Sequence, residues 1–98
     1  ANYSLKKIRE LDALAVEKKV KFLIQQLRDN DVAIRYKAIV ALGKMEQAAS
    51  GAVADLIKLL DDSDKRVSSG VLEALKQIGN PEAVKAANHY LENEKKSD

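Results

Sequence analysis

The chain has 98 residues, of which 46% are hydrophobic and 33% charged, and its formal net charge is +2. This composition is too apolar for a disordered chain, and no stretch approaches the roughly 18 apolar residues of a transmembrane helix. The absence of cysteine excludes a disulfide scaffold, a thiolate metal site and cysteine catalysis. The single histidine excludes any site that needs two. We therefore expect one small domain over residues 1–98.

The first residues are Ala1-Asn2-Tyr3, without an initiator Met or a charged-then-apolar signal segment. We accordingly expect a cytoplasmic protein, and a chain that is processed or is a piece of something longer.

The first two predicted helices span residues 4–14 and 17–28. Apolar residues at helical spacing indicate both, and Ser4 can serve as the N-cap of the first. The first helix resembles the second half of a helix pair whose partner is missing. Of the isolated aromatic residues, Tyr3 and Phe22 are expected to seal the ends of the core.

The next predicted helices span residues 31–45, 51–61, 64–78 and 81–93. Asp31 and Asp64 follow polar turns and can each accept hydrogen bonds from the first free amides of a helix. The stretch Gly79-Asn80-Pro81 combines a residue suited to a left-handed helix end, a cap and a first helical residue that needs no amide. We expect the last helix to begin there and the tail after residue 93 to fray.

The sequence repeats itself with a displacement of 33 residues. Leu23-Ile24-x-x-Leu27-x-Asp29-x-Asp31 recurs as Leu56-Ile57-x-x-Leu60-x-Asp62-x-Asp64, and the same shift relates apolar positions from residue 20 to residue 78. Each unit contains two helices and a polar turn. Repeats of this length cannot bury an apolar face alone, so neighbouring units must stack.

Two segments carry a family resemblance: Leu27-Arg28-Asp29-Asn30-Asp31 with Ile34-Arg35 and Ala41-Leu42-Gly43-Lys44-Met45, and Leu60-Asp61-Asp62-Ser63-Asp64 with Ala74-Leu75 and Ile78-Gly79-Asn80-Pro81. They resemble HEAT-like repeats of the short kind first described in phycobilisome bilin lyases. The resemblance implies an all-α fold, a right-handed α-α superhelix of about six helices. It implies two full repeats, about 17–47 and 50–80, with partial repeats at 4–14 and 81–93.

The second repeat departs from the pattern at two positions. Ser68 replaces the arginine found at Arg35, which in the family tends to bond the acid of the turn, so we expect the second turn to lack this tie. Lys76 replaces the glycine found at Gly43. Gly43 and Gly70 are expected to permit close approach of helices.

No residue pattern indicates catalysis, a cofactor or a metal. Counted as calcium loops, the Asp-rich turns lack the glycine expected at the sixth position, where Ile34 and Val67 stand. Lys85 and Asn93 stand four residues before and after His89, so neither a carboxylate nor a second ligand lies there, and Glu92, three residues on, could form only a weak hydrogen bond. We interpret His89 as an ordinary surface or end-capping histidine. We expect a protein that is not an enzyme.

The better candidate for function is a surface. On a helical wheel of residues 31–45, Tyr36 and Val40 fall on the side opposite the core. In HEAT-like stacks, this outer side of the second helix faces the concave groove. An exposed aromatic anchor with a basic rim is typical of a protein-binding patch. With the equivalent positions on the neighbouring helices, the predicted protein-binding residues are Lys6, Arg9, Tyr36, Lys37, Val40, Lys44, Ser69, Glu73 and Lys76.

These observations favour a non-catalytic scaffold that binds a protein or peptide through the concave face. An accessory subunit of a lyase or other modifying enzyme remains an alternative, as does a nucleic-acid-binding module. The net charge of +2 and Glu73 in the groove weaken the nucleic-acid alternative. No membrane partner is expected, and an apolar end face of the stack could allow weak self-association.

Overall fold

The structure is a computed structural model that describes residues 2–96 in backbone and residues 13–93 in side chain. The described residues form helices and turns without a β-strand. The elements are α1 (Asn2–Gln26), α2 (Val32–Lys44), the 3-10 segment η1 (Glu46–Ala52), α3 (Val53–Lys58), the 3-10 segment η2 (Leu59–Asp61), α4 (Lys65–Ile78) and α5 (Pro81–Lys96). The all-α fold predicted from the sequence is therefore confirmed.

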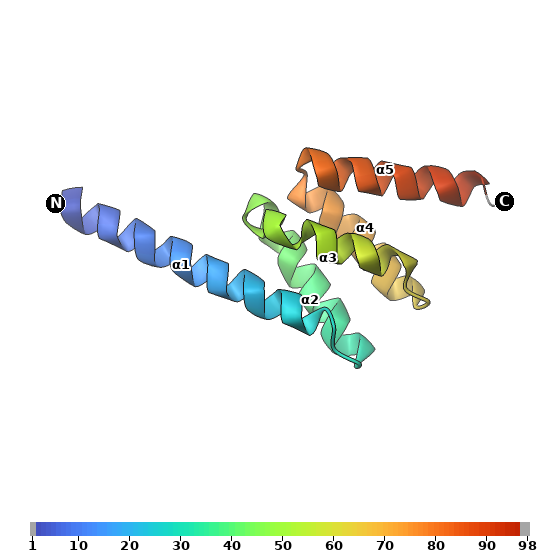
Figure 1. The fold of residues 1–98 in the computed structure, drawn as a ribbon, viewed down its shortest axis with the longest axis horizontal. Coiled ribbons are helices and arrows are strands. Elements are labelled where there is room, and N and C mark those ends of the chain that lie inside the picture. Colours follow the sequence, from blue (N-terminus) through green and yellow to red (C-terminus); the bar gives the residue numbers. More distant parts are fainter. Residues whose placement is uncertain (1, 97–98) are drawn as a thin grey trace.

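The helices form two layers of a short stack (Figure 1). The layer of first helices contains α1, α3 and α5, and the layer of second helices contains α2 and α4. The contact between α2 and α4 is the most extensive of all, and α1 packs on α2 as α3 and α5 pack on α4. The core lies between the layers, where Ile39, Leu42, Leu56, Leu75 and Ile78 are fully buried.

The N-terminal region differs from the prediction of two helices at 4–14 and 17–28, because α1 is one uninterrupted helix of 25 residues. It begins before Ser4, which therefore does not cap it. Residues 12–17, Asp-Ala-Leu-Ala-Val-Glu, contain no glycine or proline and mostly good helix formers, so nothing in the chain ends the helix there. Figure 1 shows the N-terminal half of α1 extending past the other helices.

The expected helix at 51–61 is also different. Only Val53–Lys58 is α-helical, and 3-10 segments precede and follow it. Ser50 and Gly51 have low helix propensity, which explains the tighter coil before α3. Glu46, at the start of η1, has a φ of 54°, a left-handed conformation that glycine adopts at lower cost.

The starts of the remaining helices agree with the sequence to within one residue. Asp31 and Asp64 cap α2 and α4, as expected. Gly79 ends α4 with a φ of 70°, and the Asn80 side chain accepts a hydrogen bond of 2.8 Å from the Ala83 N–H at the start of α5. The tail after residue 93 was expected to fray, but the last helix continues through it as far as Lys96.

One expected core residue lies on the surface instead. Phe22 was predicted to seal the end of the core, but 57% of its surface is exposed. Val20, Leu23 and Leu27 form the buried side of α1, and Phe22 does not share that side. Tyr3, its companion in the prediction, lies outside the described side chains.

Candidate functional site

The two turns that position the second helices are built in the same way. In the first turn, the Asp29 carboxylate accepts a 2.8 Å hydrogen bond from the Asp31 N–H, and the Asp31 carboxylate accepts one of 2.8 Å from the Ala33 N–H. Asp62 and Asp64 form the same two hydrogen bonds 33 residues later, each 2.9 Å long. The repeated turn therefore starts α2 and α4 in equivalent ways at the same edge of the molecule.

Arg35 joins these two turns. Its Nη1 donates to the Asp29 carbonyl at 2.8 Å and to the Asn30 carbonyl at 3.1 Å, and its Nη2 lies 3.7 Å from the Asp62 carboxylate. The Arg35 and Asp62 side chains are only 16% and 15% exposed, so solvent screens this ion pair less than a surface pair. The arginine thus bonds the backbone of its own turn and the acid of the next.

This arrangement corrects the expectation that the second turn lacks an arginine tie. Ser68 itself offers none, since its Oγ donates to the Lys65 carbonyl at 3.2 Å. The tie to the second turn comes instead from Arg35 of the first repeat, through Asp62.

Glycines allow α2 and α4 to approach closely, as the sequence predicted. A Cβ placed on Gly43 would contact the Gln77 Oε1 and would lie 3.1 Å from the Ala74 Cα. A Cβ on Gly70 would lie 3.1 Å from Cε2 of the Tyr36 ring. Gly43 is buried in this contact, on the side of α2 that packs against α4.

A groove of about 830 Å³ lies between the N-terminal halves of α2 and α4. The Tyr36 ring packs on Gly70 and is still 43% exposed. Around this ring the groove has apolar walls and a charged rim. Its lining residues are Asp31, Val32, Ala33, Tyr36, Lys37, Lys65, Arg66, Ser69, Gly70 and Glu73.

The structure brings together four of the predicted binding residues: the groove is lined by Tyr36, Lys37, Ser69 and Glu73. The others lie elsewhere. Val40 is half-buried, Lys76 is exposed on α4 outside the groove, and Lys44 borders a separate hollow of about 260 Å³. Lys6 and Arg9 lie outside the described side chains.

Sequence reasoning missed the first turn of each helix as part of this groove. Lys65 and Arg66 line it because α2 and α4 start side by side, which the helical wheel of a single helix does not show. The signal was present in the 33-residue displacement, since Lys65 matches Val32 and Arg66 matches Ala33.

One ion pair, between Arg66 and Asp64, changes the distribution of charge at the rim of the groove. The Arg66 guanidinium donates to Asp64 at 3.0 and 3.3 Å, and these hydrogen bonds, with one from the Arg66 N–H, hold the pKa of Asp64 below its ordinary value of 3.8. The same partner raises the pKa of Arg66. Arg66 is thus partly neutralised, whereas Lys37 and Lys65 form no ion pair within the described residues.

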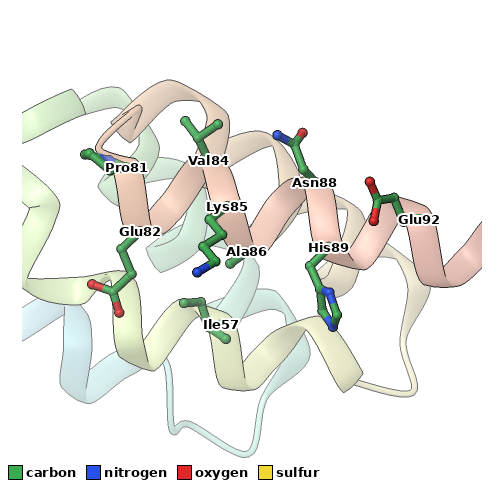
Figure 2. A pocket seen from close by; sticks show the side chains of 9 residues that line it. All are labelled: Ile57, Pro81, Glu82, Val84, Lys85, Ala86, Asn88, His89 and Glu92. Carbon is green, nitrogen blue, oxygen red and sulfur yellow. The ribbon is translucent and has the colours of Figure 1, made fainter.

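Two other grooves lie along the layer of first helices. One, of about 820 Å³, separates α3 from α5, and Figure 2 shows Lys85 and His89 extending from α5 towards the side of Ile57. The Nε2 of His89 lies 3.2 Å from the Asn93 amide nitrogen, which fits the expected surface histidine. The other groove, of about 600 Å³ between α1 and η1, is the repeat equivalent, with Ile24 at the place of Ile57.

The described residues contain no cluster of three or more side chains that could hold a metal ion. Within the same range, no helix combines the length and the hydropathy needed to cross a bilayer.

Comparison with known proteins agrees with the repeat architecture. No curated protein matches the chain significantly. A family model describing HEAT repeats matches residues 5–98. This model does not specify the bilin-lyase type of repeat. Because the match covers nearly the whole chain, and because two stacked helix pairs with equivalent turns form the structure, the chain belongs to the HEAT repeat family.

Proposed function

We propose that the protein is a non-catalytic scaffold that binds a protein segment in the groove between α2 and α4. HEAT repeats are commonly protein-interaction scaffolds. The observation that carries the proposal is Tyr36, whose ring is anchored on Gly70 and remains 43% exposed inside a groove. Exposed aromatic anchors that need little reordering are the side chains that most often dominate binding energy.

The charges around the groove favour a peptide over a nucleic acid. Lys37, Lys65 and Arg66 face Asp31 and Glu73 along the same lining, and the Arg66 charge is already paired with Asp64. A site for a phosphate backbone needs a basic track without interspersed carboxylates. A peptide with an apolar anchor and polar groups of both signs matches the groove better.

The role of accessory subunit in a modifying enzyme remains the alternative from the sequence, and it uses the same groove in a larger complex. It differs in its prediction that activity appears only when a second subunit is added. No feature of the groove favours it over a scaffold that acts alone.

The test is selection of peptides from a random display library on the full chain, followed by affinity measurement with variants. Tyr36→Ala should weaken the selected peptides by about tenfold or more, because it removes the anchor. His89→Ala, which removes an exposed aromatic in the α3–α5 groove, is the matched control and should leave affinity unchanged. Equal affinity for wild type and Tyr36→Ala would contradict the proposal. A steep loss of affinity with salt for selected oligonucleotides, where no peptide binds, would favour nucleic acid.

A further inference from the structure

The outer face of α1, defined by Leu14, Lys18 and Phe22, is a second candidate surface. These residues are spaced four apart and so share one side of the helix, opposite the buried side that contains Val20 and Leu23. Leu14 is 47% exposed and Phe22 57% exposed. They are large apolar side chains with no role in the core of the described residues.

The internal repeat shows what this side of a first helix does. Phe22 is equivalent to Asp55 of the second repeat, 33 residues on. Asp55 lies 3.6 Å from Arg28, which belongs to the turn that follows α1, so in the second repeat this position is directed towards the preceding repeat. Phe22 therefore occupies the position that contacts the preceding repeat in the second unit, with an apolar residue in place of the acid.

The neighbouring surface of α2 is not shaped for a further helix pair. Lys37 and Lys44 stand where α4 has Gly70 and Gln77. A helix packed on α2 as α2 packs on α4 would meet the Lys37 side chain, at the position where α4 has the glycine that receives Tyr36. The geometry favours a single helix lying on α1 over a repeat stacked on both helices.

Charge identifies the chemistry of that helix. Lys18 and Lys19 are exposed and make no ion pair within the described residues, whereas Lys21 is paired with Glu17 at 3.4 Å. Residues 1–28 contain seven basic and three acidic side chains. A second copy of α1 would bring the same lysines into repulsive proximity.

We propose that the outer face of α1 docks an acidic amphipathic helix, whose apolar side chains pack on Leu14 and Phe22 and whose carboxylates pair with Lys18 and Lys19. Such a helix-on-helix contact supplies two apolar anchors, Leu14 and Phe22, about two turns apart and selects its partner by charge. This surface is separate from the groove of the proposed function, so either can fail without the other.

The experiment is a titration of the ¹⁵N-labelled full chain with a synthetic helical peptide that has leucines at i, i+3, i+4 and i+7 and glutamates elsewhere. Amide shifts should change at residues 14–22. Phe22→Asp, which installs the residue of the second repeat, should weaken binding about tenfold, and Lys18→Glu should weaken it severalfold. Tyr36→Ala is the matched control and should bind as wild type does. Circular dichroism checks that the variants remain folded.

Four outcomes would overturn the proposal. The shifts could fall in the α2–α4 groove, with affinity sensitive to Tyr36→Ala instead of Phe22→Asp. A peptide with lysines in place of the glutamates could bind equally well. The shifts could depend on protein concentration without peptide, which would identify a second copy as the occupant. Vesicles of anionic lipid could shift residues 14–22 while the peptide does not.

Discussion

The two repeats share a backbone plan and differ in the side chains that connect them to their neighbours. Both start their second helix from the same pair of aspartates, and in both a left-handed residue follows that helix, Glu46 after α2 and Gly79 after α4. In the first repeat, however, Arg35 forms an ion pair with the second repeat and Gly43 allows its close approach. The equivalent residues of the second repeat are Ser68 and Lys76. Hydrogen bonds from backbone N–H groups to the turn aspartates thus recur in both repeats, whereas the side chains that join the two repeats are present in the first repeat alone.

The largest expected effect comes from the arginine tie. Arg35→Ala should lower the free energy of unfolding by about 2–3 kcal/mol, because it removes hydrogen bonds of a charged group to two carbonyls and leaves Asp62 without its partner. Ser68→Ala, at the equivalent position, should cost less than about 1 kcal/mol. Urea unfolding measures both. Equal losses would show that the two turns do not differ as described.

Exchanging the residues at the next pair of equivalent positions should give a smaller effect. Gly43→Lys should destabilise the fold by roughly 1–3 kcal/mol, because the new side chain must be accommodated 3.1 Å from the Ala74 backbone. Lys76→Gly removes an exposed side chain and should cost about 1 kcal/mol through helix propensity alone. Thermal unfolding compares the two variants. A Gly43→Lys variant no less stable than Lys76→Gly would contradict the close packing of α2 on α4.

The two N-caps, Asp31 and Asp64, should contribute similarly to stability. Asp31→Ala should cost about 1 kcal/mol, the usual effect of losing an N-cap. Asp64→Ala should destabilise as well, whereas Asp64→Asn keeps the cap and loses only the charge. Since Arg66 holds the pKa of Asp64 below 3.8, the stability from this carboxylate is present above that pH and is lost as the pH falls through the lowered pKa.

Denaturant unfolding at several pH values tests this assignment. Wild type should exceed Asp64→Asn in stability above pH 3.8 and converge with it at lower pH. A difference that persists at the lowest pH would show that the charge of Asp64 is not its cause.

The smallest effect is expected at Glu46, and its sign should be opposite to that at the equivalent Gly79. Glu46 and Gly79 are equivalent, and both have positive φ, 54° and 70°. Glu46→Gly should stabilise by about 0.5 kcal/mol, because relief of the left-handed strain exceeds the entropy that glycine adds to the unfolded chain. Gly79→Ala should destabilise by about 1 kcal/mol for the same reason. Calorimetric melting of both variants checks the signs.

Periodicity and punctuation predicted the helices that Asp31, Asp64 and Asn80 cap, because each start combines a capping residue with an apolar pattern. The displacement of 33 residues predicted the stacking. The prediction failed where no residue type gives a strong local signal. No residue between 12 and 17 ends a helix, so α1 continues through this segment. Glu46 has a left-handed backbone conformation that is typical of glycine and that its residue type does not predict.

The candidate site was predicted only in part for a related reason. The helical wheel of one helix identified Tyr36 as an aromatic residue that points away from the core. It could not identify the other residues of the groove, because these depend on how α2 and α4 lie side by side. Gly43 illustrates the difference, because a small residue opposite the core can be an open position or the closest contact with the next helix. The exposure of Phe22 was missed because an isolated aromatic was assumed to be buried.

The bridge from Arg35 to Asp62 has a consequence for cooperativity. In a linear array of repeats, the total stability is the sum of each unit's own folding free energy and of a coupling energy across each interface. A guanidinium that bonds its own turn and the following one transfers part of the first unit's stability into that coupling energy. Opening of the second unit then weakens the first, so the two units should melt as a single thermodynamic domain and not one after the other.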